Sequence, residues 1–94
     1  MVDVADVNLD TLLTSLKKKD FTNVKKWVVQ HLDNDPSIVM RKVYDSLYCV
    51  LKPASIPEAV LIIAKYMKDI TIVPDQEINM LACLTEIMMS CEFR

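Results

Sequence analysis

Apolar residues recur along this chain at helical spacing, and polar or proline-containing stretches divide them into five segments. The first segment has Asn8 as its cap and the basic run 17–19 at its end, and its apolar positions follow the i, i+3, i+4, i+7 rule: Leu9, Leu12, Leu13 and Leu16. Asp20 opens the second segment, which stops at the polar residues 33–35 and carries Phe21, Val24, Trp27, Val28 and Leu32. Two amphipathic helices are therefore predicted before residue 36.

Three further helices are predicted from their start and stop signals. Asp35-Pro36 begins a helix to about Leu51, because Asp caps free N–H groups and Pro suits the first turn. After the break at 52–54, Ser55-Ile56-Pro57-Glu58 has the form of a capping box and opens a helix to about Asp69. The β-branched stretch 70–73 has no partner strand, so we expect a connector there. A last helix then runs from Pro74-Asp75 to about Glu92.

The expected fold class is all-α, a single five-helix bundle. A chain of 94 residues is long enough for one hydrophobic core and too short for a separate active-site domain. One domain is therefore expected over residues 1–94, with the first ~7 residues flexible.

The predicted fourth and fifth helices carry apolar residues on more than one side. In the fifth, one stripe comprises Ile78, Leu81, Ala82, Thr85 and Met88, and a second comprises Met80, Leu84, Ile87 and Cys91. In the fourth, we expect Val60, Ile63, Ala64 and Met67 to face the core while Leu61, Ile62 and Tyr66 point elsewhere. Either these helices are surrounded by the others, or one stripe packs against another chain. The candidate interface residues are Ile62, Tyr66, Met80, Leu84 and Ile87.

Catalytic and metal chemistry is not expected. The chain has no glycine, so it has neither a Gly-rich phosphate loop nor a nucleophile elbow. His31 is the only histidine, and its place near the end of the second helix favours a partly exposed side chain that suits a helix C-terminus over a catalytic one. The three cysteines lack CxxC spacing, and the methionines at helical spacing are typical of core filler. We expect no enzyme activity, no cofactor and no metal in this chain.

Charge argues against a dedicated nucleic-acid module. The net charge is −2, whereas such modules usually carry a basic excess. One local cluster is basic although the whole chain is not. It consists of four lysines near Trp27: Lys18, Lys19, Lys25 and Lys26. These lysines are weak candidates for contact with DNA phosphates, with Trp27 available for stacking. The favoured interpretation is a solvated helix end, with Trp27 anchoring the first two helices to the bundle.

Cysteine usage and the start of the chain bear on its compartment. An odd number of cysteines without framework spacing favours a reducing cytoplasm, and the acidic start is unlike a secretory signal. The longest strongly apolar run, 59–64, is far shorter than the ~20 residues of a membrane span. We expect a soluble, cytoplasmic protein with no membrane partner.

Three segments resemble the C-terminal collar domain of clamp-loader small subunits in the replication factor C family. The opening, Asp10 to Asp20 (DTLLTSLKKKD) followed by Phe21-Thr-Asn-Val and a tryptophan helix, looks like the start of that domain. The stretch 38–51 with Pro57-Glu58-Ala59 resembles its third and fourth helices. The close, Glu77 to Glu86 (EINMLACLTE) and Cys91-Glu92-Phe93-Arg94, is similar to the terminal helix of the loader ATPase subunit from T-even-type bacteriophages.

This resemblance implies an oligomerisation role in DNA replication. Collars of the family associate side by side and hold a five-membered loader together. The preceding AAA+ ATPase domains bind ATP and magnesium, open the sliding clamp and release it around primed DNA. None of their motifs occurs here, so the expected partners of this chain are other loader subunits, and the clamp and DNA are reached through the missing domains. A phage-encoded chain would act in the host cytoplasm.

Two other functions remain open from the residues. One is a self-contained helical adaptor that binds a partner helix or peptide in a methionine-lined groove. The other is a small nucleic-acid accessory protein that uses the lysine cluster.

Overall fold

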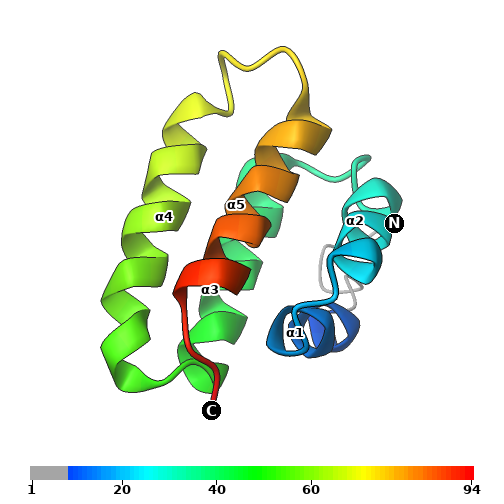
Figure 1. Ribbon diagram of the computed structural model, residues 1–94. Coiled ribbons are helices and arrows are strands. Elements are labelled where there is room, and N and C mark those ends of the chain that lie inside the picture. Colours follow the sequence, from blue (N-terminus) through cyan, green and yellow to red (C-terminus); the bar gives the residue numbers. More distant parts are fainter. Residues whose placement is uncertain (1–8) are drawn as a thin grey trace.

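The computed structural model describes residues 9–94, and these residues form an all-α bundle (Figure 1). Its helices are α1 (Leu9–Lys17), α2 (Phe21–Gln30), α3 (Pro36–Val50), α4 (Ile56–Asp69) and α5 (Gln76–Ser90), with a short 3-10 turn, η2 (Pro53–Ser55), before α4. Helix α4 packs against both α3 and α5, whereas α2 and α1 pack on the other side of α5. The predicted all-α class is confirmed for the described residues.

Aspartate caps begin three of the helices where the sequence predicts them. The Asp20 carboxylate accepts a hydrogen bond from the Asn23 N–H (3.2 Å), and Asp35 accepts one from the Ser37 N–H (2.9 Å). Asp75 accepts from the N–H groups of Glu77 and Ile78 at 3.0 and 3.2 Å. These bonds satisfy N–H groups that have no partner within their helices. The proposed Asn8 cap and the flexible start lie outside the described residues.

The turn between α1 and α2 adopts a left-handed conformation without glycine. Lys19 has φ 58°, the only positive φ among the described residues. The Lys19 side chain also donates from Nζ to the carbonyl oxygen of Met88 (2.8 Å), in the last turn of α5. A positively charged group is favourable at the C-terminal end of a helix. The hydrogen bond from Lys19 therefore ties the α1–α2 turn to the end of α5.

The chain end differs from the sequence prediction. Helix α5 ends at Ser90, because the residues after it turn back along the corner between α3 and η2. The Lys52 N–H donates to the Glu92 carbonyl, and the Arg94 N–H donates to the Val50 carbonyl, both at 2.9 Å. The predicted capping box at Ser55 is wrong, since the Ser55 hydroxyl makes no cap bond and accepts from the Glu92 N–H instead (2.9 Å).

One hydrophobic core connects all five helices. Buried side chains from each helix meet in it, among them Leu16, Trp27, Leu47, Ile63 and Leu84. Trp27 is 2% exposed, so the prediction that it anchors the first two helices is confirmed. The predicted connector at 70–73 is also confirmed, as these residues form turns and no strand.

Replacing a leucine of this core distinguishes buried from surface positions. Leu84→Ala is expected to lower the free energy of unfolding by about 2–5 kcal/mol, because Leu84 is 2% exposed and leaves a cavity. Leu61→Ala is the matched control, since Leu61 is 71% exposed and its loss is expected to cost about 0.5 kcal/mol or less. Urea denaturation followed by circular dichroism measures both. Equal losses for the two variants contradict this core.

Candidate interaction surface

The predicted interface residues of α5 lie inside the molecule. Met80, Leu84 and Ile87 are only 3%, 2% and 0% exposed, and they pack in the core of their own chain. Their assignment to an exposed interface is therefore wrong. The physical reason is the position of α5, whose Met80–Ile87 stripe faces the neighbouring helices. Periodicity identifies two stripes but does not say which one is covered.

The partition of α4 needs the same correction. Ile62 is 4% exposed and belongs to the core, so it is not an interface residue. Ile63 faces the core as predicted, and Leu61 points outward as predicted. Val60, Ala64 and Met67 are exposed, contrary to the prediction that they face the core. Tyr66 is half-buried at the contact between α4 and α5.

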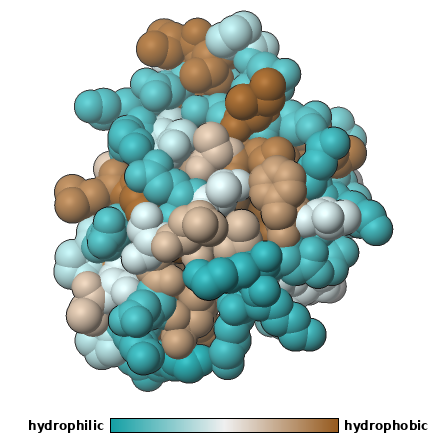
Figure 2. Space-filling model, viewed as in Figure 1, coloured by the Kyte–Doolittle hydropathy of each residue, from teal (hydrophilic) through white to brown (hydrophobic). Residues whose placement is uncertain are grey.

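The exposed apolar surface of α5 follows the other stripe only in part. Met88 of that stripe is buried at 3% exposure, whereas Ile78 and Met89 are 64% and 68% exposed, and half-buried residues lie between them. Phe21 at the start of α2 joins this stripe, and the surface is slightly hollowed, with a volume of about 410 Å³. We call this surface the α5 face, made of Phe21, Ile78, Leu81, Ala82 and Met89. Figure 2 shows brown and tan apolar surface over the middle of the side that α5 presents, bordered by teal polar regions.

A polar cluster forms the edge of the α5 face toward α4. The Glu86 carboxylate pairs with Lys65 Nζ (2.9 Å) and accepts a hydrogen bond from the Tyr66 hydroxyl (2.8 Å). Lys65 Nζ also lies 4.9 Å from the centre of the Tyr66 ring. The hydrogen bonds from Lys65 and Tyr66 lower the pKa of Glu86, so this edge of the α5 face carries a fixed carboxylate.

A second apolar surface lies between α3 and α4. We call it the α3–α4 groove; its volume is about 300 Å³, and it is lined by Arg41, Tyr44, Val60, Ile63, Ala64 and Met67. The Arg41 guanidinium lies 5.5 Å from the centre of the Tyr44 ring and pairs with Asp45 at 3.3 Å. The ring of Tyr44 also contacts that of Tyr48 edge-on, with the ring centres 6.3 Å apart. The groove is not apparent from the sequence pattern, which predicts that Val60, Ala64 and Met67 face the core.

The lysine cluster is not a single free surface. Lys18, Lys25 and Lys26 are exposed, but the ammonium group of Lys19 is held by the Met88 carbonyl. Trp27 is buried and stacks on His31, with ring centres 4.1 Å apart, so its ring is not an open platform for bases. His31 is the C-cap residue of α2 and donates from Nδ1 to the Trp27 carbonyl (2.7 Å), and its half-buried place at this helix end agrees with the expectation.

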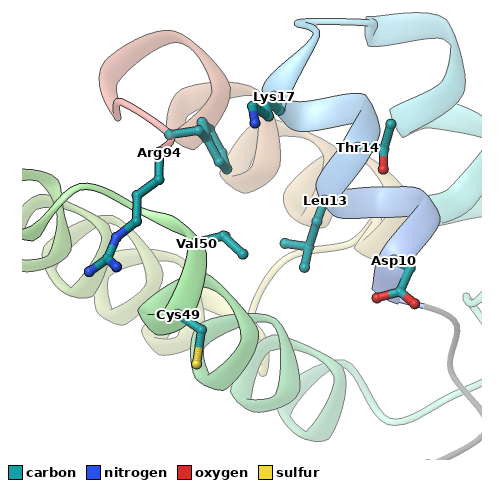
Figure 3. Close-up of a pocket in the computed structure, with 8 residues that line it drawn as sticks. Asp10, Leu13, Thr14, Lys17, Cys49, Val50 and Arg94 are labelled. Atoms are coloured by element: carbon teal, nitrogen blue, oxygen red, sulfur yellow. The ribbon is translucent and has the colours of Figure 1, made fainter.

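A third hollow, of about 400 Å³, lies between α1, the end of α3 and the chain end (Figure 3). Leu13 and Val50 face each other across it, while the Arg94 guanidinium points away. Asp10, Lys17 and Cys49 stand around it without a histidine among them. Arg94 Nε donates to the Leu51 carbonyl (3.0 Å), so this arginine is engaged in holding the chain end.

The buried thiols are also unsuited to chemistry. Burial raises the pKa of the Cys83 thiol to about 12, and burial likewise raises the pKa of Cys91.

Within residues 9–94 no three His, Cys, Asp or Glu side chains gather in a way that suits a metal ion. None of the described helices is both long and apolar enough to cross a membrane.

Comparisons with known proteins add no family. No protein-family model matches the chain, and no curated protein matches it significantly in sequence. The resemblance to clamp-loader collars therefore stays a prediction. The two apolar surfaces that the described residues form are the α5 face and the α3–α4 groove.

The contact between Tyr66 and Glu86 predicts a pH dependence. Burial, together with the hydrogen bond to Glu86, raises the pKa of Tyr66 to about 12. The pKa of Tyr66 in the folded chain thus lies above its ordinary value of 10. The protonated hydroxyl therefore stabilises the folded state fully below pH 10, and this stabilisation is lost as the pH rises through about 12. Glu86→Gln is expected to lower the pKa of Tyr66 toward 10, as measured by NMR of the ring carbon that bears the hydroxyl.

Glu77→Gln is the control for this titration, because Glu77 lies on the same helix and its backbone bonds to Asp75 rather than to Tyr66. Tyr66→Phe identifies the signal by removing it. An unchanged Tyr66 titration in the Glu86→Gln variant argues against the contact.

Proposed function

We propose that this chain is a non-catalytic association domain that binds other helical chains through the α5 face. The observation that supports this most is the apolar stripe from Ile78 to Met89, which the chain leaves uncovered although α5 is packed on its other side. Contiguous apolar surface of this kind typically marks a protein interaction site. The fixed carboxylate of Glu86 at its edge gives the contact a preferred orientation.

The free energies of burial and of association indicate that a contact through the α5 face alone is weak. Phe21, Ile78 and Met89 keep 45–68% of their surface exposed, and covering each is worth about 1–2 kcal/mol. Association itself costs roughly 4–15 kcal/mol in lost freedom of motion. Such a face suits a subunit that other domains or further contacts hold in place, because tethering makes part of that cost unnecessary.

A contact that is weak alone and useful within a tethered assembly is what the collar domain that the sequence resembles requires. In a clamp loader the collar holds subunits together while ATPase domains move, so nucleotide-driven motion acts on a tethered assembly. We therefore propose a collar of a sliding-clamp loader subunit as the specific role. ATP and magnesium would then belong to other domains of the subunit. The role of this chain is to keep the subunits adjacent.

A self-contained adaptor is the second candidate, favoured by the α3–α4 groove with Met67 in its lining. The coding sequence upstream of Met1 distinguishes the two. A collar predicts an open frame that continues upstream into an ATPase domain with a phosphate-binding loop. A stop codon in frame just upstream of a start at Met1 contradicts the collar and favours the adaptor.

Substitution on the α5 face tests the association role. Self-association of the free chain is expected to be weak and to become visible in sedimentation velocity only as its concentration approaches about 1 mM, where a net binding free energy of about 4 kcal/mol gives half occupancy. The double variant Ile78→Glu, Met89→Glu is expected to be monomeric, because burying two carboxylates in the contact is unfavourable. Its circular dichroism is expected to match the wild type, since both side chains are exposed.

The control for this variant is Val29→Glu, Ile72→Glu, which places the same charges on exposed positions outside the α5 face. This control is expected to associate as the wild type does. Unchanged association of the Ile78, Met89 variant removes the α5 face from the proposal.

A further inference from the structure

We infer that Met89 is an oxidative modification site that controls contact through the α5 face. A peroxide converts the Met89 thioether to a sulfoxide, and this change weakens the contact while the fold stays intact. The inference rests on the proposed association role and adds to it a way in which the contact is regulated. Two properties of the molecule support it, the exposure of Met89 and the burial of the methionines that belong to the core.

The methionines within residues 9–94 differ widely in exposure. Met89 is 68% exposed and Met67 is 36% exposed, whereas Met40, Met80 and Met88 are each 3% exposed. A peroxide has to reach the sulfur atom, so the order in which methionines react follows their exposure. Met89 is therefore expected to react first, and about 10-fold or more faster than the three buried methionines.

Met89 lies in the apolar part of the α5 face. It lines the same hollow as Phe21, Ile78 and Leu81, so its side chain is among those that a bound chain covers. A methionine sulfoxide is polar, and its oxygen needs a hydrogen-bond partner once water is excluded from it. Covering the oxidised side chain with an apolar surface is therefore unfavourable, and the contact loses one of its most exposed apolar groups.

The fold does not depend on the Met89 side chain, because the preceding residue supplies the contacts that hold this end of α5. The Met88 side chain is buried in the core, and the Met88 carbonyl oxygen accepts the hydrogen bond from Lys19 Nζ (2.8 Å). Both contacts are made by atoms that remain unchanged when the Met89 sulfur is oxidised. Two adjacent methionines thus have separate roles, one in the core and one on the surface.

The reaction is an oxidation of the thioether by a peroxide. A lone pair of the Met89 sulfur attacks one oxygen of hydrogen peroxide, an S–O bond forms and the O–O bond breaks. The transferred oxygen gives its proton to the departing hydroxide, which leaves as water, so the sulfur is oxidised and the peroxide is reduced. Methionine sulfoxide reductases reverse this change, with one enzyme for each sulfoxide epimer, so the modification is reversible.

Contact and oxidation exclude each other at this site. When another chain covers the α5 face, Met89 is shielded from peroxide, and when Met89 is oxidised, the α5 face binds more weakly. Chains outside an assembly are therefore the ones that are oxidised. They join an assembly again after the sulfoxide has been reduced.

Peroxide treatment of three chains tests this inference. All three carry Cys49→Ser, because the exposed Cys49 thiol also reacts with peroxide. One is otherwise wild type, one carries Met89→Leu, and one carries Met67→Leu as the matched control outside the α5 face. Peptide mass spectrometry identifies the oxidised methionines, circular dichroism verifies the fold, and sedimentation velocity at about 1 mM measures association before and after treatment.

Association of the otherwise wild-type chain is expected to weaken about 10-fold after treatment and to return when both reductases are added. The Met67→Leu chain is expected to show the same loss. Association of the Met89→Leu chain is expected to be the same after treatment as before it, because leucine has no sulfur to oxidise.

Equal weakening of the Met89→Leu chain overturns the inference, since Met67 or Met1 then causes the change. Unchanged association of a chain that is fully oxidised at Met89 also overturns it, while the association role of the α5 face stands. Loss of the helical signal on oxidation of Met89 alone contradicts the separation of surface from core. If the untreated chain is monomeric at about 1 mM, the proposed function itself fails, and the inference fails with it.

Discussion

The position of α5 determines most of this structure. One of its sides is buried against the helices around it, through Met80, Leu84 and Ile87, and the other side stays exposed from Ile78 to Met89. One side of the helix therefore belongs to the core, and its other side forms most of the α5 face. Burial of the Met80–Ile87 stripe holds the bundle together. Residues of the exposed stripe can therefore be substituted without loss of the fold, so the contact surface can change independently of the core.

Two connections hold α5 in this position, and neither uses glycine. Lys19 adopts a left-handed conformation and donates to the Met88 carbonyl, so the α1–α2 turn supports the end of α5. The residues after Ser90 pair with the end of α3 and bond to Ser55. The α1–α2 turn and the chain end thus both meet the C-terminal end of α5, and the outward stripe of α5 is presented by a well-supported helix rather than by a loose end.

The sequence predicts the helices of this fold well, because their start signals are local. Asp20, Asp35 and Asp75 each cap a helix through bonds that span two or three residues. The candidate surface was harder to predict, since Met80 and Ile78 are equally apolar and only the placement of neighbouring helices decides which is covered. The same holds for Ala64 and Met67 on α4. Ser55 illustrates the limit most clearly, because its hydroxyl bonds to Glu92, which is far away in the sequence.

The central claim is that the exposed stripe of α5 meets another chain while its buried stripe does not. Methyl NMR of the wild-type chain during dilution measures this directly, because each methyl group reports on its own surroundings. The account predicts that the methyl signals of Ile78 and Met89 move with concentration while those of Met80 and Ile87 stay constant. Movement of the Met80 and Ile87 signals, or constant signals for Ile78 and Met89 across an observed association, would contradict it.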